Sequence, residues 1–248
     1  MVDILYAAAT GCIAGLIPVY LGLLPLPLFR RLSSARRSLV VAFSVGILLF
    51  LFVDVTGEAM ELSKAANYGS ILFAAGLAMG LGPPLLIASR RHSVGDRLSP
   101  ETRDSARTLI AYIISVAIGL HNLGEGLAIG SAYAGGKIAL TTILVVGFAL
   151  HNGTEGMAIS GPASDIPVRV REPIIMGFLA GFPTVIGSVI GSVSYSSLAG
   201  AFFFSIAAGA LLYVVVELLR RSQSQGSTFA GLLIGLLLMY FTELFLSI

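Results

Sequence analysis

Charged residues are scarce in this chain, and cysteine is nearly absent. Only 11% of its 248 residues are Asp, Glu, Lys or Arg, whereas 56% are hydrophobic. Because a soluble domain carries about 25% charged residues, this composition excludes an ordinary soluble protein and indicates a protein of the bilayer. The single cysteine, Cys12, cannot form an internal disulfide. The net charge of +2 gives no sign of a nucleic-acid partner.

The apolar residues form eight runs, each long enough to cross a bilayer as a helix, which takes roughly 20 residues. The predicted spans are 3–29, 38–61, 68–89, 108–132, 138–160, 173–195, 198–219 and 228–247. The runs lack the period-2 alternation of barrel strands. No basic leader precedes the first run, which is therefore expected to be a retained span. The sequence predicts an all-α, polytopic membrane protein with a single transmembrane domain over residues 1–248.

Basic residues are distributed unevenly between the two sides of the predicted bundle. The connections after spans one, three, five and seven contain Arg30, Arg31, Arg36, Arg37, Arg90, Arg91, Arg97, Arg103, Arg107, Arg169, Arg171, Arg220 and Arg221. The opposite side contains only Lys64 and Lys137. Because positively charged loops stay in the cytoplasm, both termini are expected on the non-cytoplasmic side of a cell membrane. Residues 90–107 read as a polar cytoplasmic loop between spans three and four, in which His92 and Asp96 could deliver metal but an ordinary linker is favoured.

A weak internal repeat relates the two ends of the chain. AFSVGILLFLFVD, ending at Asp54, aligns with SIAAGALLYVVVE, ending at Glu217, and AGLIPVYLG in the first span resembles AGFPTVIG in the sixth with a one-residue shift. Spans 1–3 and 6–8 would then be inverted three-helix repeats that flank a central antiparallel pair, spans 4 and 5. Inverted repeats of this kind are common in secondary transporters.

Two similar clusters of polar residues lie inside the central spans. GLHNLGEGLAIG, from Gly119, and ALHNGTEGMAIS, from Ala149, each contain His-Asn, two spacers and Glu-Gly. Residues four apart share a helix face, so His121 projects with Glu125 and His151 with Glu155. A carboxylate at this depth costs several kcal/mol and usually marks an ion or proton path. A bound cation would supply the missing countercharge.

The donor set favours a transition metal. Imidazole nitrogen with carboxylate oxygen suits zinc and its neighbours, whereas magnesium and calcium favour oxygen alone. Asn122 and Asn152 lie beside these ligands and are either weak ligands or groups that orient them, a choice that the sequence leaves open. Zinc is the expected substrate, with iron, manganese and cadmium as alternatives. No resident cofactor is expected.

With these motifs the chain resembles the ZIP (Zrt/Irt-like) family of divalent metal transporters, and most closely its GufA-like branch. DVTGEA from Asp54 and GALLYVVVEL from Gly209 extend the resemblance to the second and seventh spans. The resemblance implies eight helices, with a metal site between spans four and five. His121, Glu125, His151 and Glu155 match its primary site, and Asn122 and Asn152 match a second site present in two-metal members.

The chain departs from the family pattern at Phe182 and at Asn152, where some members have an acid, and further acids fit a route across the membrane. Phe182 precedes Pro183 where many members have Glu-Pro, which favours one ion per cycle. Asp54 and Glu58 share a helix face near the predicted outer side and could gather cations. Glu217 lies near the predicted inner end of span seven, where it either receives the ion or pairs with a neighbouring arginine. Glu243 receives no role beyond surface polarity.

These features predict transport of a divalent metal into the cytoplasm by alternating access. A metal-selective channel is the first alternative. An intramembrane metal-dependent hydrolase is the second, and it is disfavoured because Asn122 and Asn152 replace the general-base Glu that follows the first His in H-E-x-x-H enzymes. The protein is therefore not expected to be an enzyme. Whether it forms a homodimer is left open.

Overall fold

We analysed a computed structural model of the chain, which describes residues 3–64, 67–92, 100–164, 171–194, 196–221 and 225–246. Those residues contain helices and no strand. The helices are α1 (Ile4–Gly11), η1 (Cys12–Leu16, a π-helix), α2 (Ile17–Leu23), α3 (Leu26–Phe29), α4 (Ser34–Ser63), α5 (Gly69–His92), α6 (Pro100–Ala134), α7 (Ile138–Ala163), α8 (Arg171–Val193), α9 (Ser197–Arg221) and α10 (Gln225–Leu246).

The helices correspond to the predicted spans one for one, and the all-α prediction is confirmed. The first span is the continuous series α1, η1, α2 and α3, and α4 to α10 are spans two to eight. Within the described residues, seven of these spans are long and apolar enough to cross a membrane, and a shorter apolar stretch, Thr228–Leu244, lies in α10. The protein is therefore a multi-pass membrane protein.

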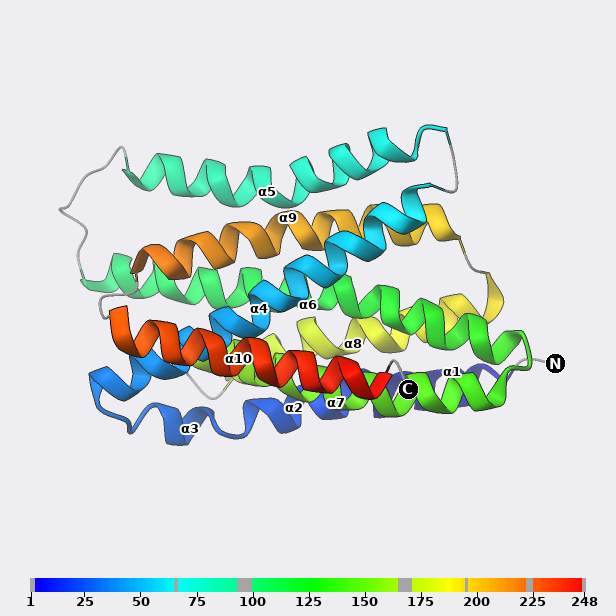
Figure 1. The fold of residues 1–248 in the computed structure, drawn as a ribbon, viewed down its shortest axis with the longest axis horizontal. Coiled ribbons are helices and arrows are strands. Elements are labelled where there is room, and N and C mark those ends of the chain that lie inside the picture. The colour runs from blue at the N-terminus through cyan, green and yellow to red at the C-terminus, as the bar shows by residue number, and fades with distance from the viewer. Residues whose placement is uncertain are drawn as a thin grey trace.

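The helices lie roughly along one long axis, and α4 crosses its neighbours obliquely (Figure 1). The start of α1 and the end of α10 lie toward the same end of the bundle, as an even number of crossings requires. α6 packs mainly on α8, α4 on both α10 and α9, and α5 on α9, while the first span packs on α7 and α8. α6 and α7 thus lie in the middle of the bundle, between the first span and α8 on one side and α4, α9 and α10 on the other.

Glycines allow the closest of these contacts. A Cβ atom on Gly46 of α4 would collide with the backbone of α10 around Gly235, and one on Gly209 of α9 would collide with that of α5 around Gly80. Small residues let helix backbones approach closely in membranes. Gly46 and Gly209 are aligned in the repeat, so the aligned glycines make corresponding contacts. The complete inverted-repeat arrangement stays a prediction.

The predicted loop 90–107 is much shorter than expected. α5 continues to His92 and α6 begins at Pro100, and residues 93–99, which include Asp96, lie outside the described residues. The charges of residues 100–107 suggested a loop, but Pro at the first helical position followed by Glu101 is a helix-start signal. Charged residues can continue a membrane helix into water, so polarity alone did not mark the end of the helix.

Candidate metal centre

A tight turn holds α6 and α7 as an antiparallel hairpin. Gly136 adopts φ 70°, a left-handed conformation that favours glycine. The amide of Lys137 donates to the oxygen of Ala132 at 3.0 Å, and that of Gly136 donates to the oxygen of Tyr133 at 2.9 Å. These two bonds form the Schellman motif that commonly ends a helix. The turn thereby places the two polar clusters on neighbouring helices.

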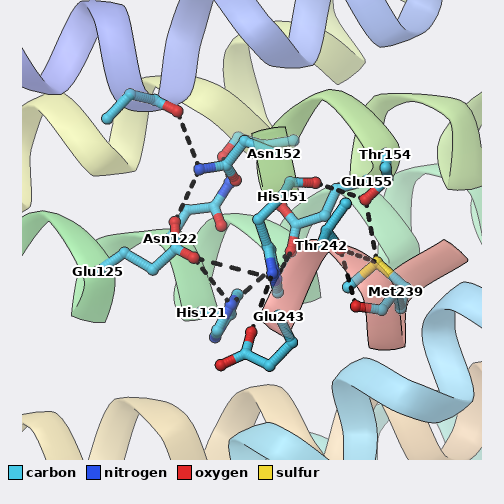
Figure 2. Close-up of polar contacts among 12 residues, drawn as sticks. His121, Asn122, Glu125, His151, Asn152, Thr154, Glu155, Met239, Thr242 and Glu243 are labelled. Carbon is cyan, nitrogen blue, oxygen red and sulfur yellow. Dashed lines mark hydrogen bonds and ion pairs between the residues drawn. The ribbon is translucent and has the colours of Figure 1, made fainter. Parts of the chain in front are cut away.

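The four predicted ligands converge between these helices, and Figure 2 shows their side chains pointing toward one another. The Nε2 atom of His121 lies 3.3 Å from Oε1 of Glu125 and 3.7 Å from Oε1 of Glu155. The Nε2 atom of His151 lies 3.4 Å from the same atom of Glu155 and 4.0 Å from that of Glu125. Each imidazole therefore faces both carboxylates. All four side chains are at least 94% buried.

The spacing of these atoms suits a tetrahedral ion. Zinc binds nitrogen and carboxylate oxygen at about 2.0–2.2 Å, and a tetrahedron with such bonds has edges of about 3.3–3.6 Å. The four distances between imidazole nitrogen and carboxylate oxygen are 3.3, 3.4, 3.7 and 4.0 Å. Small side-chain movements would bring the longer two into this range. His121, Glu125 and His151 form a buried group whose ligand atoms all lie within 4.8 Å of one another, and Glu155 is not part of that group.

Many polar atoms of this cluster are buried without a hydrogen-bond partner among the described residues. They are both ring nitrogens of His121 and of His151, both carboxylate oxygens of Glu155, Oε1 of Glu125, and Oδ1 of Asn122 and of Asn152. Buried polar atoms normally have partners, and each exception needs an explanation such as an ion. A cation among nitrogen and oxygen lone pairs would satisfy several of them together.

The two asparagines are held by backbone carbonyls of the flanking spans. Nδ2 of Asn152 donates to the oxygen of Ala14 at 3.0 Å and to Oε2 of Glu125 at 2.7 Å. Nδ2 of Asn122 donates to the oxygen of Ala180 at 3.1 Å. Because a carbonyl oxygen accepts and only the amide nitrogen donates, these bonds fix which way each amide points. Each Asn thus uses its nitrogen for orientation and leaves its oxygen as a candidate ligand.

The two anchoring carbonyls occupy corresponding places in the repeat. The Ala-Gly pair at Ala14 aligns with that at Ala180, and the first span has one more residue before its proline. That span contains the π-helix at Cys12–Leu16, the form that a helix commonly takes around an inserted residue, often at a functional site. Pro18 is four residues after Ala14 and lacks an N–H. The Ala14 carbonyl therefore lacks its usual helical donor, and the Asn152 amide takes that place.

Glu243 was predicted to have no role beyond surface polarity, and the structure corrects this. Its Oε2 lies 3.8 Å from Nδ1 of His151, on the opposite side of the ring from the cluster of ligand atoms, and its side chain is only 38% exposed. The sequence did contain the signal, because an acid inside an apolar span is a functional candidate by default. It was overlooked because Glu243 falls close to the end of the predicted span.

α9 and α10 close the cluster with apolar side chains. The Phe204 ring packs against the His121 ring with centroids 5.7 Å apart, and Gly124 leaves the space that the Phe204 ring fills. Met239 is fully buried, and its sulfur accepts a hydrogen bond from Thr154 at 3.0 Å. Phe182, which stands at the family's Glu position, stacks on Phe178 with centroids 4.5 Å apart. Phe204 and Met239 therefore shield the cluster from water on the α9 and α10 sides.

The three predicted pathway acids lie at different places. Asp54 is half-buried on α4 and interacts electrostatically with His151 and Glu243. Glu58, one turn further along α4, is exposed and interacts electrostatically with His121. Glu217 is half-buried near the end of α9. The first two thus border the cluster, and the role of Glu217 stays a prediction.

The bundle of apolar helices identifies an integral membrane protein. The buried His/Glu cluster inside it is a candidate metal site. A family model described as ZIP Zinc transporter matches residues 87–243, which include α6 to α9 and most of α10. The chain belongs to the ZIP family of metal transporters, so divalent metal transport is its activity at the level of the family. The GufA-like assignment stays a prediction. A comparison with curated proteins found no match.

Proposed function

We propose that this protein carries zinc across a cell membrane into the cytoplasm by alternating access, with His121, Glu125, His151 and Glu155 as the ligands of the travelling ion. The observation that carries this proposal is the convergence of two imidazole nitrogens and two carboxylates inside the bundle, where each Nε2 atom lies 3.3–4.0 Å from an oxygen of both carboxylates. Iron, manganese and cadmium are alternative substrates with the same donor preference. One ion is bound in each cycle.

The proposed route begins on the non-cytoplasmic side, where both termini are expected. Glu58 is exposed there and Asp54 follows one turn deeper on α4, so the two carboxylates would gather cations and pass them inward. Glu243 borders the cluster beside His151 and extends this acidic path. Glu217 would receive the ion on the cytoplasmic side. The basic cytoplasmic connections support this orientation.

Two other functions make different predictions. A metal-selective channel would give a flux that keeps rising with metal concentration, whereas alternating access gives a flux that saturates. A metal-dependent hydrolase would need a general base beside a metal-bound water, and both carboxylates of the cluster are placed as ligands. Saturation of uptake in proteoliposomes therefore distinguishes the first alternative from the proposal.

The ligand assignment is tested by zinc uptake into proteoliposomes that contain a zinc-sensitive dye. Glu125→Ala and Glu155→Ala should each abolish uptake, because an imidazole pair with one carboxylate holds the ion more weakly and leaves buried atoms without a partner. Asp3→Asn is the matched control, since Asp3 is an exposed helix cap and Asn caps equally well. Near-normal uptake by a correctly folded Glu125→Ala or Glu155→Ala variant would overturn the assignment.

A further inference from the structure

A cavity of about 510 Å³ lies between α6, α8 and α9, outside the metal cluster. Leu120, Leu123 and Leu127 line it from α6, at the three- and four-residue spacing of one helix face. Its volume is in the range of small-molecule sites, about 300–1,000 Å³. Unlike most such sites, it has hydroxyls at one end as its only polar side chains. We propose that this groove binds one acyl chain of a membrane phospholipid.

The surroundings of the groove identify this occupant. Leu179, Ile186 and Ile190 line it from α8, and the two isoleucines remain 41% and 48% exposed. α6, α8 and α9 are all membrane-spanning helices, so the open side of the groove faces hydrocarbon. At that depth the molecules around the protein are lipid acyl chains, so an acyl chain is the ligand available to fill the apolar groove.

The polarity and length of the groove fit a single chain with its headgroup at one end. The hydroxyl residues Ser194 and Ser196 line the end of the groove at the connection between α8 and α9, where the headgroup would lie. From Leu179 to Ile190 a helix rises about 16 Å, close to half of the roughly 30 Å hydrocarbon core. One leaflet therefore matches the apolar length. With the predicted orientation, the lipid comes from the non-cytoplasmic leaflet.

A second copy of this chain is a poorer occupant. A stable protein interface takes about 20–30 residues from each partner, whereas thirteen residues line this groove. The groove is also concave and faces the bilayer along its open side. These properties favour a narrow, flexible acyl chain over a helix from a second copy of the protein.

Two residues that line the groove are chain neighbours of residues at the metal cluster. Leu120 precedes His121 on α6, and Phe203 of the α9 wall precedes Phe204, whose ring packs on His121. A chain in the groove therefore contacts α6, α8 and α9 together. If the proposed transport function holds, the bound lipid restrains movement between these helices during transport. That effect on transport rests on the proposed function, whereas lipid binding does not depend on it.

The absence of tryptophan from the chain provides the test. In Phe203→Trp, which exchanges one aromatic ring for another, a single Trp reports from the groove, and in Ile174→Trp it reports from an exposed position of α8 that does not line the groove. Each full-length variant is reconstituted in phosphatidylethanolamine and phosphatidylglycerol that carry brominated acyl chains, which quench Trp fluorescence. It is then extracted into mild detergent, so that only retained lipid can quench.

Phe203→Trp should remain quenched in detergent while the Ile174→Trp control recovers its emission, and native mass spectrometry should find one retained phospholipid per chain. Ile186→Trp, which fills the groove, should lose that phospholipid. Full recovery of the emission of Phe203→Trp, or equal lipid retention by Ile186→Trp and the unmodified protein, would overturn the proposal. A dimer that Ile186→Trp dissociates without change in bound lipid would also overturn it. None of these outcomes depends on zinc uptake, so they are independent of the proposed transport.

Discussion

Asn152 donates a hydrogen bond from its side-chain amide to the backbone oxygen of Ala14, at 3.0 Å. The same nitrogen donates to Oε2 of Glu125 at 2.7 Å. One amide thus joins three helices, with α7 bonded to the first span and to α6. Asn152 thus orients the carboxylate of Glu125, a candidate ligand. The sequence left open whether Asn152 is itself a ligand or an orienting group. The bond to Ala14 also makes the geometry of the cluster dependent on a carbonyl that Pro18 leaves without its helical donor.

Replacement of this amide should be costly. Asn152→Leu preserves the approximate size of the side chain but leaves the buried Ala14 carbonyl and Glu125 carboxylate each without a donor. Loss of a partner of a buried polar group costs about 1–3 kcal/mol, so thermal unfolding in detergent should occur at a clearly lower temperature and zinc affinity should fall. Asn122→Leu is the matched comparison because it removes only the bond to Ala180. Equal stability of Asn152→Leu and the unmodified protein would contradict this role.

Glu243 should support metal binding through His151. The carboxylate lies 3.8 Å from Nδ1, beyond hydrogen-bond distance, but its charge favours the tautomer whose proton is on Nδ1, which leaves Nε2 free to bind metal. Loss of a hydrogen-bonded carboxylate at this place typically lowers metal affinity 10–100-fold. Glu243→Gln should therefore weaken zinc binding within about that range, measured by competition with a chelating dye. Thr242→Val serves as the control, because that hydroxyl bonds to the Met239 carbonyl of its own helix. If Glu243→Gln binds zinc with unchanged affinity, Glu243 does not support metal binding through His151.

Acid should release the metal. Ligation needs neutral imidazoles and ionised carboxylates, and protonation of either group competes with the ion. Zinc binding should therefore weaken as the pH is lowered from neutral to acidic values. Equilibrium zinc binding across this range measures the effect without a proton gradient. Binding that is constant or stronger in acid would be inconsistent with ligation by His121 and His151.

The chain should hold one ion. Phe182 stands where many family members have a glutamate, and its ring stacks on Phe178. Asn152, where some members have an acid, adds no negative charge. Metal analysis of the zinc-saturated protein after removal of free metal should therefore give one zinc per chain. Two equivalents that both disappear in Glu125→Ala would instead indicate a binuclear centre.

The sequence predicted the helices and the four candidate ligands because their signals are strong and local. Apolar runs must be about 20 residues long to cross a bilayer, and the i and i+4 spacing places His121 and Glu125 on one face. The boundary of the predicted loop was wrong because charge does not stop a helix that continues into water, as it does from Pro100.

The neighbours of the cluster could not be predicted in the same way. The bonds of Asn152 to Ala14 and of Asn122 to Ala180 depend on how four helices pack, and backbone carbonyls leave no trace in the sequence. The one-residue shift between the two Ala-Gly segments did point to irregular backbone, and the π-helix at Cys12–Leu16 occupies that region. Only the structure relates that irregularity to the orientation of Asn152.

The most direct measurement of the central claim is the position of the metal itself. Crystals of the zinc-loaded protein, measured on both sides of the zinc absorption edge, locate zinc by its anomalous scattering. We predict a single strong peak inside the bundle, about 2.0–2.2 Å from Nε2 of His121, Nε2 of His151 and the carboxylates of Glu125 and Glu155. A fully loaded protein whose zinc lies elsewhere, with these four side chains unbound, would contradict the account.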